Sequence, residues 1–398
     1  MAVTTEVFDV VVLGAGAAGL MCAATAGYRG RRVLVLEKSN KPGKKILMSG
    51  GGRCNFTHLH TQQNHYISAN PAFCISALKR YTPQDFLELA ERHGVEWTEK
   101  TPGQLFCVDS SRPILDLLLT ECEWAGVELR TKQEVSAVNK QANGFALTVN
   151  GKSIMAESLV VATGGLSIPT LGGSPFGYQL AEQFGHTVLP TRAGLVPVTL
   201  QPELRDSLAA LAGVSANVVV KTEQHAFNEP LLITHRGLSG PGILQISSYW
   251  QPGETLWIDW SQDQYAQWRE ALHQQKRQQP HSHWLGFLQQ HLSKRLAQWL
   301  LAFHQWQEPL QHYSFEKLDQ QLSLLCHWPV KPNGTEGYRT AEVTLGGVDT
   351  RQVSSRDFES ELVPGLYFIG EVLDVTGHLG GHNFQWAWSS GFCAGQKV

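Results

Sequence analysis

Residues 8–37 read FDVVVLGAGAAGLMCAATAGYRGRRVLVLE, and this stretch decides the fold. It begins with a short apolar run at residues 8–13, passes through a glycine turn into an alanine-rich segment, and ends in a second apolar run at residues 32–37. Continuous apolar strands on either side of a helix are typical of a parallel sheet that is covered on both faces. The stretch therefore predicts an α/β domain that starts at the N-terminus.

The turn between the two runs is a G-x-G-x-x-G motif made of Gly14, Ala15, Gly16, Ala17, Ala18 and Gly19. In such a turn the first glycine permits a tight bend, the second lets the backbone approach a pyrophosphate, and the third lets helix and strand pack closely. The helix N-terminus adds free N–H groups and the positive end of its dipole. Glu37, at the end of the second run, is placed to bind a ribose diol and disfavours the 2′-phosphate of NADP. The nucleotide is therefore FAD or NAD.

Two later strand ends favour FAD over NAD. Residues 158–162 predict a buried strand that ends in Thr163-Gly164-Gly165, and residues 365–369 predict another that ends in Gly370-Glu371. Flavoproteins built in two parts use such a late Gly-acid pair to hold the ribityl chain. The following Gly380-Gly381-His382-Asn383 opens a helix and is expected to aim backbone N–H groups at the pyrimidine edge of the flavin. No second G-x-G-x-x-G follows a strand, so NAD(P)H would visit the flavin only as a transient reductant.

A basic, glycine-rich segment lies between these motifs, and its residues 43–55 read GKKILMSGGGRCN. Residues 29–53 hold eight basic side chains and one acidic side chain. Lys44 and Arg53 are expected to contact the FAD pyrophosphate or an anionic substrate. The three arginines of residues 29–32 are expected to be solvated surface charges.

The residues expected to bind the cofactor lie at these strand ends and in the glycine-rich loop, together with Val135. They are Gly14, Ala15, Gly16, Ala17, Ala18, Gly19, Glu37, Lys38, Gly43, Lys44, Ser49, Gly51, Gly52, Arg53, Cys54, Asn55, Val135, Thr163, Gly164, Gly165, Gly370, Glu371, Asp374, Gly380, Gly381, His382 and Asn383. The loop holds a single cysteine, which excludes the disulfide reductases because that class needs two there. Six histidines between His273 and His312 lack the spacing of metal ligands, so no metal is expected.

Composition excludes several other classes. The 398 residues predict two or three domains. The net charge of −3, from 32 basic and 35 acidic residues, argues against a chain that binds nucleic acid by its overall charge. Seven scattered cysteines without a C-x-x-C pair predict reduced thiols in a cytoplasmic protein. The N-terminus has no secretory pattern, and the glycines of the first apolar run argue against a membrane span.

The chain is expected to form a two-part domain around an insert. Residues 1–193 and 338–398 are the two parts of the FAD-binding domain, residues 194–261 a β-rich insert, and residues 262–337 a helical insert. In the helical insert, apolar residues recur at three- and four-residue steps from Leu285 to Phe303, which predicts one helix there. Ser314 is expected to cap a further helix.

Several of these segments resemble one known family, the BaiN/RdsA (YhiN-like) FAD-dependent flavoproteins of bacteria. The resemblance covers nearly the whole chain and rests on residues 14–19, 46–57, 234–241 and 370–374 with the Gly380-Gly381 pair. Residues 333–342 and 384–390 match the enterobacterial YhiN branch most closely. The resemblance implies a Rossmann-like FAD-binding domain with a parallel sheet, interrupted by an insert that holds a small β-barrel and a helical bundle.

The family resemblance also implies a reaction. The YhiN branch resembles a ribosomal RNA dihydrouridine synthase that acts on 23S RNA of the large subunit, with hydride passing from flavin N5 to uridine C5=C6. A second branch reduces conjugated C=C bonds of oxo-bile acids, and other relatives are aminoacetone oxidases. Three interpretations therefore stay open: an RNA-modifying reductase that uses NAD(P)H, a small-molecule ene-reductase or amine oxidase, and a ribosome-assembly factor that retains FAD without catalysis.

Beyond the cofactor motifs, a cysteine, two histidines and six cations are considered for roles in catalysis or RNA binding. Cys54 is the expected general acid, whose thiol would protonate C5, with a buried inert thiol as the alternative. In the family an aromatic residue, usually Tyr, takes the place of His382, so neither His378 nor His382 is assigned a shared catalytic role. Six cations are candidate contacts for RNA phosphates or simple surface charges: Arg192, Arg236, Lys276, Arg277, Lys294 and Arg295.

Overall fold

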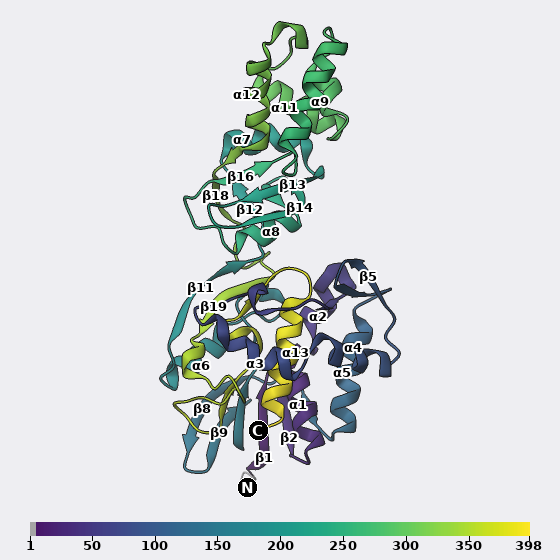
Figure 1. Ribbon diagram of the computed structural model, residues 1–398. Coiled ribbons are helices and arrows are strands. Elements are labelled where there is room, and N and C mark those ends of the chain that lie inside the picture. The colour runs from purple at the N-terminus through teal and green to yellow at the C-terminus, as the bar shows by residue number, and fades with distance from the viewer. Residues whose placement is uncertain (1–4) are drawn as a thin grey trace. The chain divides into compact units, whose positions relative to one another are not determined.

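The computed structural model describes residues 5–398, which divide into two compact units. The first unit contains the chain up to Ala193 and again from Glu342 to Val398. The second unit is Gly194–Ala341. The first unit therefore consists of two separate parts of the sequence (Figure 1).

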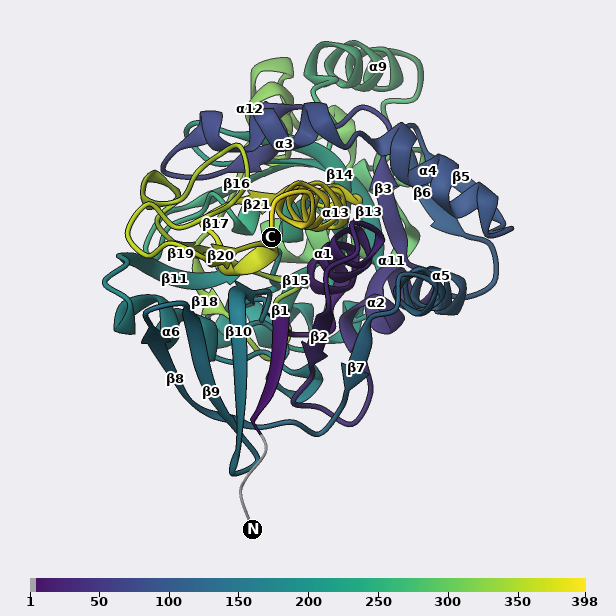
Figure 2. The ribbon, with the colours of Figure 1, turned by 90° about the horizontal axis from the view of Figure 1, so that it is seen from below.

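The first unit is built on a sheet of five parallel strands (Figure 2). In spatial order they are β7 (Glu128–Arg130), β2 (Val33–Leu36), β1 (Glu6–Leu13), β10 (Lys152–Val161) and β20 (Leu366–Phe368). Val10, Val11 and Val12 of the central strand β1 are fully buried, as are Leu34 and Val35 of β2. Burial on both faces explains the continuous apolar runs. The predicted α/β class with a parallel sheet is confirmed.

Strand β10 joins the two sequence parts of this unit. Its first half pairs antiparallel with β9 (Gly144–Val149), which pairs in turn with β8 (Val135–Gln141). Its second half pairs in parallel with β20, so that Val160 lies opposite Tyr367. The chain that returns after residue 342 therefore completes the sheet that residues 6–161 begin.

Helix α1 (Ala17–Tyr28) packs against this sheet, and α13 (His382–Gly395) lies side by side with α1 (Figure 2). Small residues allow their close approach, since a Cβ atom on Gly391 would lie 2.5 Å from the carbonyl oxygen of Ala18. Helix α5 (Arg112–Trp124) also packs on α1. The apolar core of the unit lies between the sheet and these helices.

Smaller elements complete the first unit. Its other helices are α2 (Lys44–Met48), α3 (Cys74–Arg80), α4 (Pro83–Arg92) and α6 (Phe176–Gln183). Its other strands form three small sheets: β3 (Asn55–His58), β6 (Gln104–Cys107) and β5 (Trp97–Thr101); β4 (Tyr66–Ile67) and β21 (Thr376–Gly377); β11 (Val188–Gly194) and β19 (Val343–Val348).

The second unit combines an antiparallel sheet with helices around its own core. The strands, in spatial order, are β17 (Trp328–Val330), β16 (Leu256–Asp259), β13 (Ser215–Lys221), β14 (Ala226–Ile233), β15 (Gly237–Ser239), β12 (Val198–Leu200) and β18 (Pro332–Thr335). The helices are α7 (Pro202–Leu208), α8 (Pro241–Ser247), α9 (Tyr265–Gln278), α10 (Trp284–Leu288), α11 (Lys294–His304) and α12 (Phe315–Cys326). Closure of this sheet into a barrel stays a prediction.

The predicted single helix from Leu285 to Phe303 is wrong. Two helices, α10 and α11, occupy this stretch, and Ser293 between them has extended backbone angles (φ −60°, ψ 146°) that end the α-helical path. The apolar spacing continues across the break because both helices bury one side in the same core. The predicted cap of α12 is confirmed, since the side chain of Ser314 accepts the N–H of Lys317 at 3.1 Å. Between residues 5 and 398, no helix has both the length and the apolar character that crossing a membrane requires.

Candidate functional site

The glycine motif lies at the carboxyl end of β1, where ligands of open parallel sheets bind. Gly14 has φ +107°, and a Cβ atom there would lie 2.5 Å from the carbonyl oxygen of Ala162 on the neighbouring strand. A Cβ atom on Gly19 would overlap with the carbonyl oxygen of Gly14. Gly16 differs, because a Cβ atom there would meet no atom within 4 Å. Two glycines thus serve packing, and the third faces open space at the start of α1.

Glu37 lies beside this turn at the end of β2. Its carboxylate accepts the N–H of Ala15 at 3.0 Å and that of Ser39 at 2.7 Å, which fixes it next to the glycine motif. Lys38 forms an exposed ion pair of 3.0 Å with Glu134, immediately before Val135 begins β8. The structure therefore brings Glu37, Lys38 and Val135 to one corner of the sheet edge.

The glycine-rich loop approaches the same turn. The N–H of Gly43 donates to the carbonyl oxygen of Ala15 at 2.9 Å, and α2 begins directly after it. Gly51 and Gly52 have φ of +66° and +85°, and a Cβ atom on either would meet nothing within 4 Å. The conformation requires glycine, and the loop leaves open space like that at Gly16.

Two cations of this loop are available to an anion. In the described residues 5–398, the side chains of Lys44 and Arg53 have no hydrogen bond or ion pair. The three arginines of residues 29–32 differ, because each has a partner at the other end of the strands: Arg29 donates to the carbonyl oxygen of Val398, Arg31 pairs with Glu157, and Arg32 donates to the carbonyl oxygen of Val7. These three arginines were expected to be solvated surface charges, and the structure adds that each also has a hydrogen-bond or ion-pair partner.

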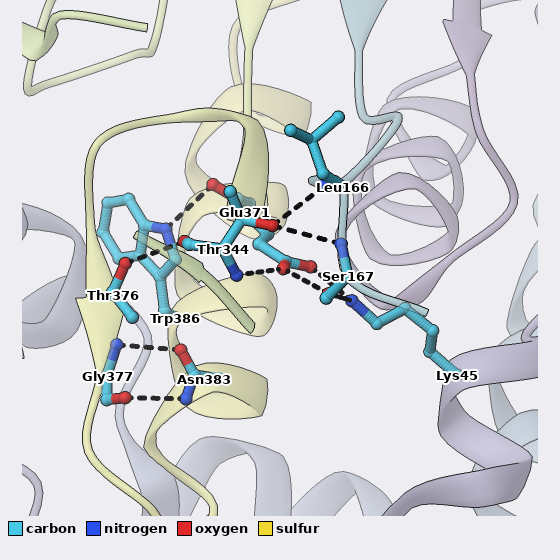
Figure 3. A network of polar contacts seen from close by, with 10 residues as sticks. Lys45, Leu166, Ser167, Thr344, Glu371, Thr376, Gly377, Asn383 and Trp386 are labelled. Carbon is cyan, nitrogen blue, oxygen red and sulfur yellow. Dashed lines mark hydrogen bonds and ion pairs between the residues drawn. The ribbon is translucent and has the colours of Figure 1, made fainter. Parts of the chain in front are cut away.

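A polar network of Lys45, Ser167, Thr344 and Glu371, the Lys45–Glu371 network, joins four separate segments (Figure 3). The Lys45 ammonium donates to Glu371 Oε2 and to Ser167 Oγ, both at 2.7 Å. Glu371 Oε1 accepts Ser167 Oγ–H and the backbone N–H of Thr344, both at 3.0 Å. The carboxylate is thus held by three donors, and its side chain keeps 21% of its surface exposed.

Sequence reasoning identified Glu371 and missed its three partners. The turn that carries it is also fixed by α13: the N–H of Gly370 donates to Ser390 Oγ and the Trp386 indole donates to the carbonyl oxygen of Gly370, both at 3.1 Å. A Cβ atom on Gly164 would find only Glu371 Oε2 within 4 Å, at 3.6 Å. The structure thereby brings the predicted Gly164 and Glu371 together.

Other predicted cofactor residues hold loops of the protein itself. The Asn383 amide accepts the N–H of Gly377 and donates to its carbonyl oxygen, both at 2.8 Å (Figure 3). The Asp374 carboxylate accepts the N–H of Ala69 at 2.7 Å, and burial raises the pKa of this carboxyl. Their contacts with a cofactor stay predictions.

Three imidazoles, which we call the histidine stack, lie at the start of α13. The ring of His382 stacks on those of His58 and His65, with centroids 4.4 and 4.5 Å away. The Nδ1 atoms of His58 and His65 accept the N–H groups of His60 and Gln62, at 3.1 and 3.0 Å. Burial, assisted by the neighbouring imidazoles, lowers the pKa of His58 to about 4 and that of His382 to about 2. The rings are therefore neutral near neutral pH.

Cys54, the expected general acid, lies in a strained and closed position. It has φ +43° and is fully buried, and its backbone N–H donates to the carbonyl oxygen of Ser49 at 3.1 Å. Burial raises the pKa of its thiol. The thiol is therefore a weak acid that no solvent reaches, and its catalytic role stays a prediction.

The predicted phosphate contacts of the second unit mostly have partners within the chain. Arg236 and Arg277 form ion pairs with Glu336 and Glu270, at 3.6 and 3.7 Å. Lys276 and Arg295 donate to backbone carbonyl oxygens. Among the described residues, no three His, Cys, Asp or Glu side chains gather as metal ligands would.

Comparisons with known proteins identify the family of the chain. A family model described as "HI0933-like protein Rossmann domain" matches residues 8–397. The "Ribosomal RNA dihydrouridine synthase" of Escherichia coli (strain K12) is 54% identical over 99% of this chain and 98% of its own length. The "3-dehydro-bile acid delta(4,6)-reductase" of Clostridium scindens is 29% identical over 97% of this chain and 98% of its own.

A solved structure shares the fold of the whole chain. It is the 3-ketosteroid-delta4-(5alpha)-dehydrogenase from Rhodococcus jostii RHA1 in complex with 4-androstene-3,17-dione. The match has a TM-score of 0.51 and 16% identity, and it covers 100% of this chain and 99% of that one. At this identity the likeness concerns the fold alone.

Proposed function

The chain belongs to the HI0933-like Rossmann-domain family, and on that premise we propose that it is an FAD-dependent oxidoreductase that reduces uridine C5=C6 in 23S ribosomal RNA to dihydrouridine. The observation that carries the proposal is the 54% identity over 99% of the chain to the ribosomal RNA dihydrouridine synthase of Escherichia coli. The similarity to a bile-acid reductase supports reduction of a C=C bond as chemistry common to both relatives.

The residues at the sheet edge fit FAD. Gly16 at the start of α1 leaves room where free N–H groups and the helix dipole attract a pyrophosphate. Glu37 is fixed beside it as an acceptor for a ribose diol. Lys44 is free to pair with a phosphate oxygen, and the Glu371 carboxylate, held by its network, can accept a hydroxyl of the ribityl chain.

Residues of the chain would stabilise negative charge on the reduced flavin and bind the RNA beside the uracil base. When bound and reduced, the flavin supplies hydride to an electron-poor C=C such as that of uracil. The N–H groups at the start of α13, after Gly380 and Gly381 with φ of +114° and +97°, would stabilise negative charge on the reduced ring. The target uridine must leave its stack to reach the site, and Arg53 offers a cation to a flanking phosphate.

The test is a direct product assay. The purified yellow protein is incubated without oxygen with NADPH or NADH and with large-subunit RNA that lacks modifications, and nucleosides are analysed by mass spectrometry. We expect a uridine product heavier by two hydrogen atoms, absent without protein or without donor. A Gly16→Val variant is the matched control, because its side chain enters the space at the start of α1.

Two further substrates make a negative result informative. A precursor large-subunit particle tests whether the RNA must be presented in an assembling structure. A small conjugated enone tests the ene-reductase interpretation. Reduction of the flavin by the donor without product from either RNA form would contradict the proposal, and rapid turnover of the enone in that case would favour the small-molecule reductase.

A further inference from the structure

The proposed reduction needs a proton donor as well as a hydride, and the following inference rests on the proposed function. Adding hydride to C6 of uracil leaves an electron pair that must be protonated at C5. Cys54 is poorly suited to give that proton, since its side chain is fully buried and burial raises the pKa of its thiol. A donor must be able to touch the base and to regain a proton from water.

Glu342 is a carboxylic acid with these properties. It lies where the chain re-enters the first unit, immediately before β19, and its side chain is exposed between the buried residues Ala341 and Val343. In the described residues 5–398 its carboxyl group has no hydrogen bond or ion pair. Buried residues thus hold the backbone on both sides of Glu342, while its carboxyl group is open to water and has no hydrogen-bond or ion-pair partner in the described residues.

The electrostatics of Glu342 link it to the predicted cofactor residues. Burial raises the pKa of its carboxyl, and the charge of Lys45 opposes that rise. The side chain keeps exposed surface although its carboxyl is desolvated, so the group retains access to water. Glu342 is two residues before Thr344, whose backbone N–H donates to Glu371 Oε1 at 3.0 Å, so the chain brings Glu342 close to the Lys45–Glu371 network, in which Lys45 bonds Glu371 at 2.7 Å. An acid whose pKa is raised toward neutrality is suited to general acid catalysis.

We propose that Glu342 is the proton donor of the reduction and that Lys45 tunes it. As C6 receives the hydride from the reduced flavin, the C5=C6 π bond breaks and its electron pair takes the proton of the Glu342 carboxyl at C5. Glu342 is left as a carboxylate, which the Lys45 ammonium stabilises, and water returns the proton through the exposed side. A bound reduced flavin would supply the hydride with its electron pair, and the base would end with two added hydrogens, so electrons and protons balance.

Glu342→Gln removes the acid and keeps the shape of the side chain. With pre-reduced enzyme and RNA, we expect single-turnover formation of dihydrouridine to fall by about 10²-fold or more. FAD content and the rate of flavin reduction by the nicotinamide should stay within about twofold of wild type. For comparison, a change of about 1.4 kcal/mol in either free energy would be a tenfold effect. Glu342→Asp should restore part of the rate. Glu361→Gln, at an exposed glutamate of the same unit, is the matched control.

A second readout does not depend on turnover. Carboxyl ¹³C resonances of the protein, assigned by their loss in Glu342→Gln, report the titration of Glu342. We expect it to titrate above an ordinary glutamate, and still higher in Lys45→Met, where the opposing ammonium is gone. Glu371 is the other charged partner of Lys45 and is followed in the same spectra.

The outcomes separate the inference from the proposed function. Unchanged product formation in Glu342→Gln, together with its loss in Cys54→Ala, would overturn the assignment and leave the RNA reductase intact. An ordinary or lowered titration of Glu342 would also count against it. If wild-type protein forms no dihydrouridine from free RNA or particle while its flavin is reduced, the proposed function fails and the assignment fails with it.

Discussion

The Lys45–Glu371 network and the histidine stack both hold polar side chains inside the first unit, by opposite physical means. The network pairs an ammonium with a carboxylate and adds two neutral donors, with 33% and 21% of the charged side chains exposed. The stack keeps its rings neutral, and backbone N–H groups occupy the Nδ1 atoms of two of them. One arrangement depends on charge, whereas the other depends on its absence.

This difference teaches which change should harm each arrangement. Removing one partner of the network leaves an unpaired charge that is partly out of water, which costs more than the pair contributes. Adding a proton to the stack places a charge on rings that are desolvated and already close to one another. Substitution is therefore the sensitive test of the network, and acid is the sensitive test of the stack.

The largest effect is expected for Glu371→Ala. The change leaves the Lys45 ammonium, the Ser167 hydroxyl and the Thr344 N–H without their common acceptor. We expect the free energy of unfolding of the protein without FAD to fall by about 2–3 kcal/mol, below the value for a fully buried pair because both side chains retain exposure. Urea unfolding measures this loss, and absorbance of the bound flavin reports the expected loss of FAD.

A double-mutant cycle separates the pair from its surroundings. Lys45→Met, Glu371→Gln and the double variant should give a coupling energy of about 1–2 kcal/mol between the two side chains. A coupling near zero would show that the 2.7 Å contact does not stabilise the fold, and that Glu371 acts through the Ser167 hydroxyl and the Thr344 N–H.

An intermediate effect is expected when the histidine stack is exposed to acid. The pKa of His58 is about 4 in the folded chain, and its ordinary value of 6.5 applies to the unfolded chain. The unfolded chain therefore binds more protons below about pH 6.5. The contribution of neutral His58 is complete above about pH 6.5 and is lost as the pH falls toward about 4. Because the ring is half-buried, we expect a loss on the order of 1–2 kcal/mol. Urea unfolding across this range measures it.

His58→Phe sharpens this test, since a phenyl ring can stack on His382 and cannot take a proton. The variant should lose less stability than wild type across the same pH range. His281→Phe, at an exposed histidine of the second unit, should leave the pH dependence unchanged. An identical pH dependence in all three proteins would place the acid sensitivity outside the stack.

The sequence predicted the parts of this site that are local. Residues 8–37 contain both strands, the turn and the helix of the first βαβ segment, and the close packing at Gly14 and Gly19 and the open space at Gly16 follow from their places in it. Glu37 and Glu371 were found because each follows a strand, and carboxyl ends of parallel strands share one edge. Periodicity and strand order carry this information without any knowledge of contacts.

The missed partners are those that only tertiary structure brings together. Ser167 is 122 residues from Lys45 in sequence, and Glu371 is 326 residues from it, so no local pattern links them. Sequence reasoning chose Lys44 over Lys45, and which of two adjacent lysines faces Glu371 depends on how α2 starts after Gly43, at φ +64°. The histidine stack was hidden for the same reason, because His58, His65 and His382 come from separate segments.

The smallest effect is expected at an ion pair that has the charge of the network without its burial. Lys38 and Glu134 are 3.0 Å apart, with 73% and 67% of their side chains exposed. Glu134→Gln should change the free energy of unfolding by less than about 0.5 kcal/mol, because water screens the pair and solvates the lysine left behind. The urea measurement used for Glu371→Ala checks this value. A loss as large as that of Glu371→Ala would mean that charge alone accounts for both effects, and that partial burial with shared donors does not distinguish the Lys45–Glu371 network from an exposed pair.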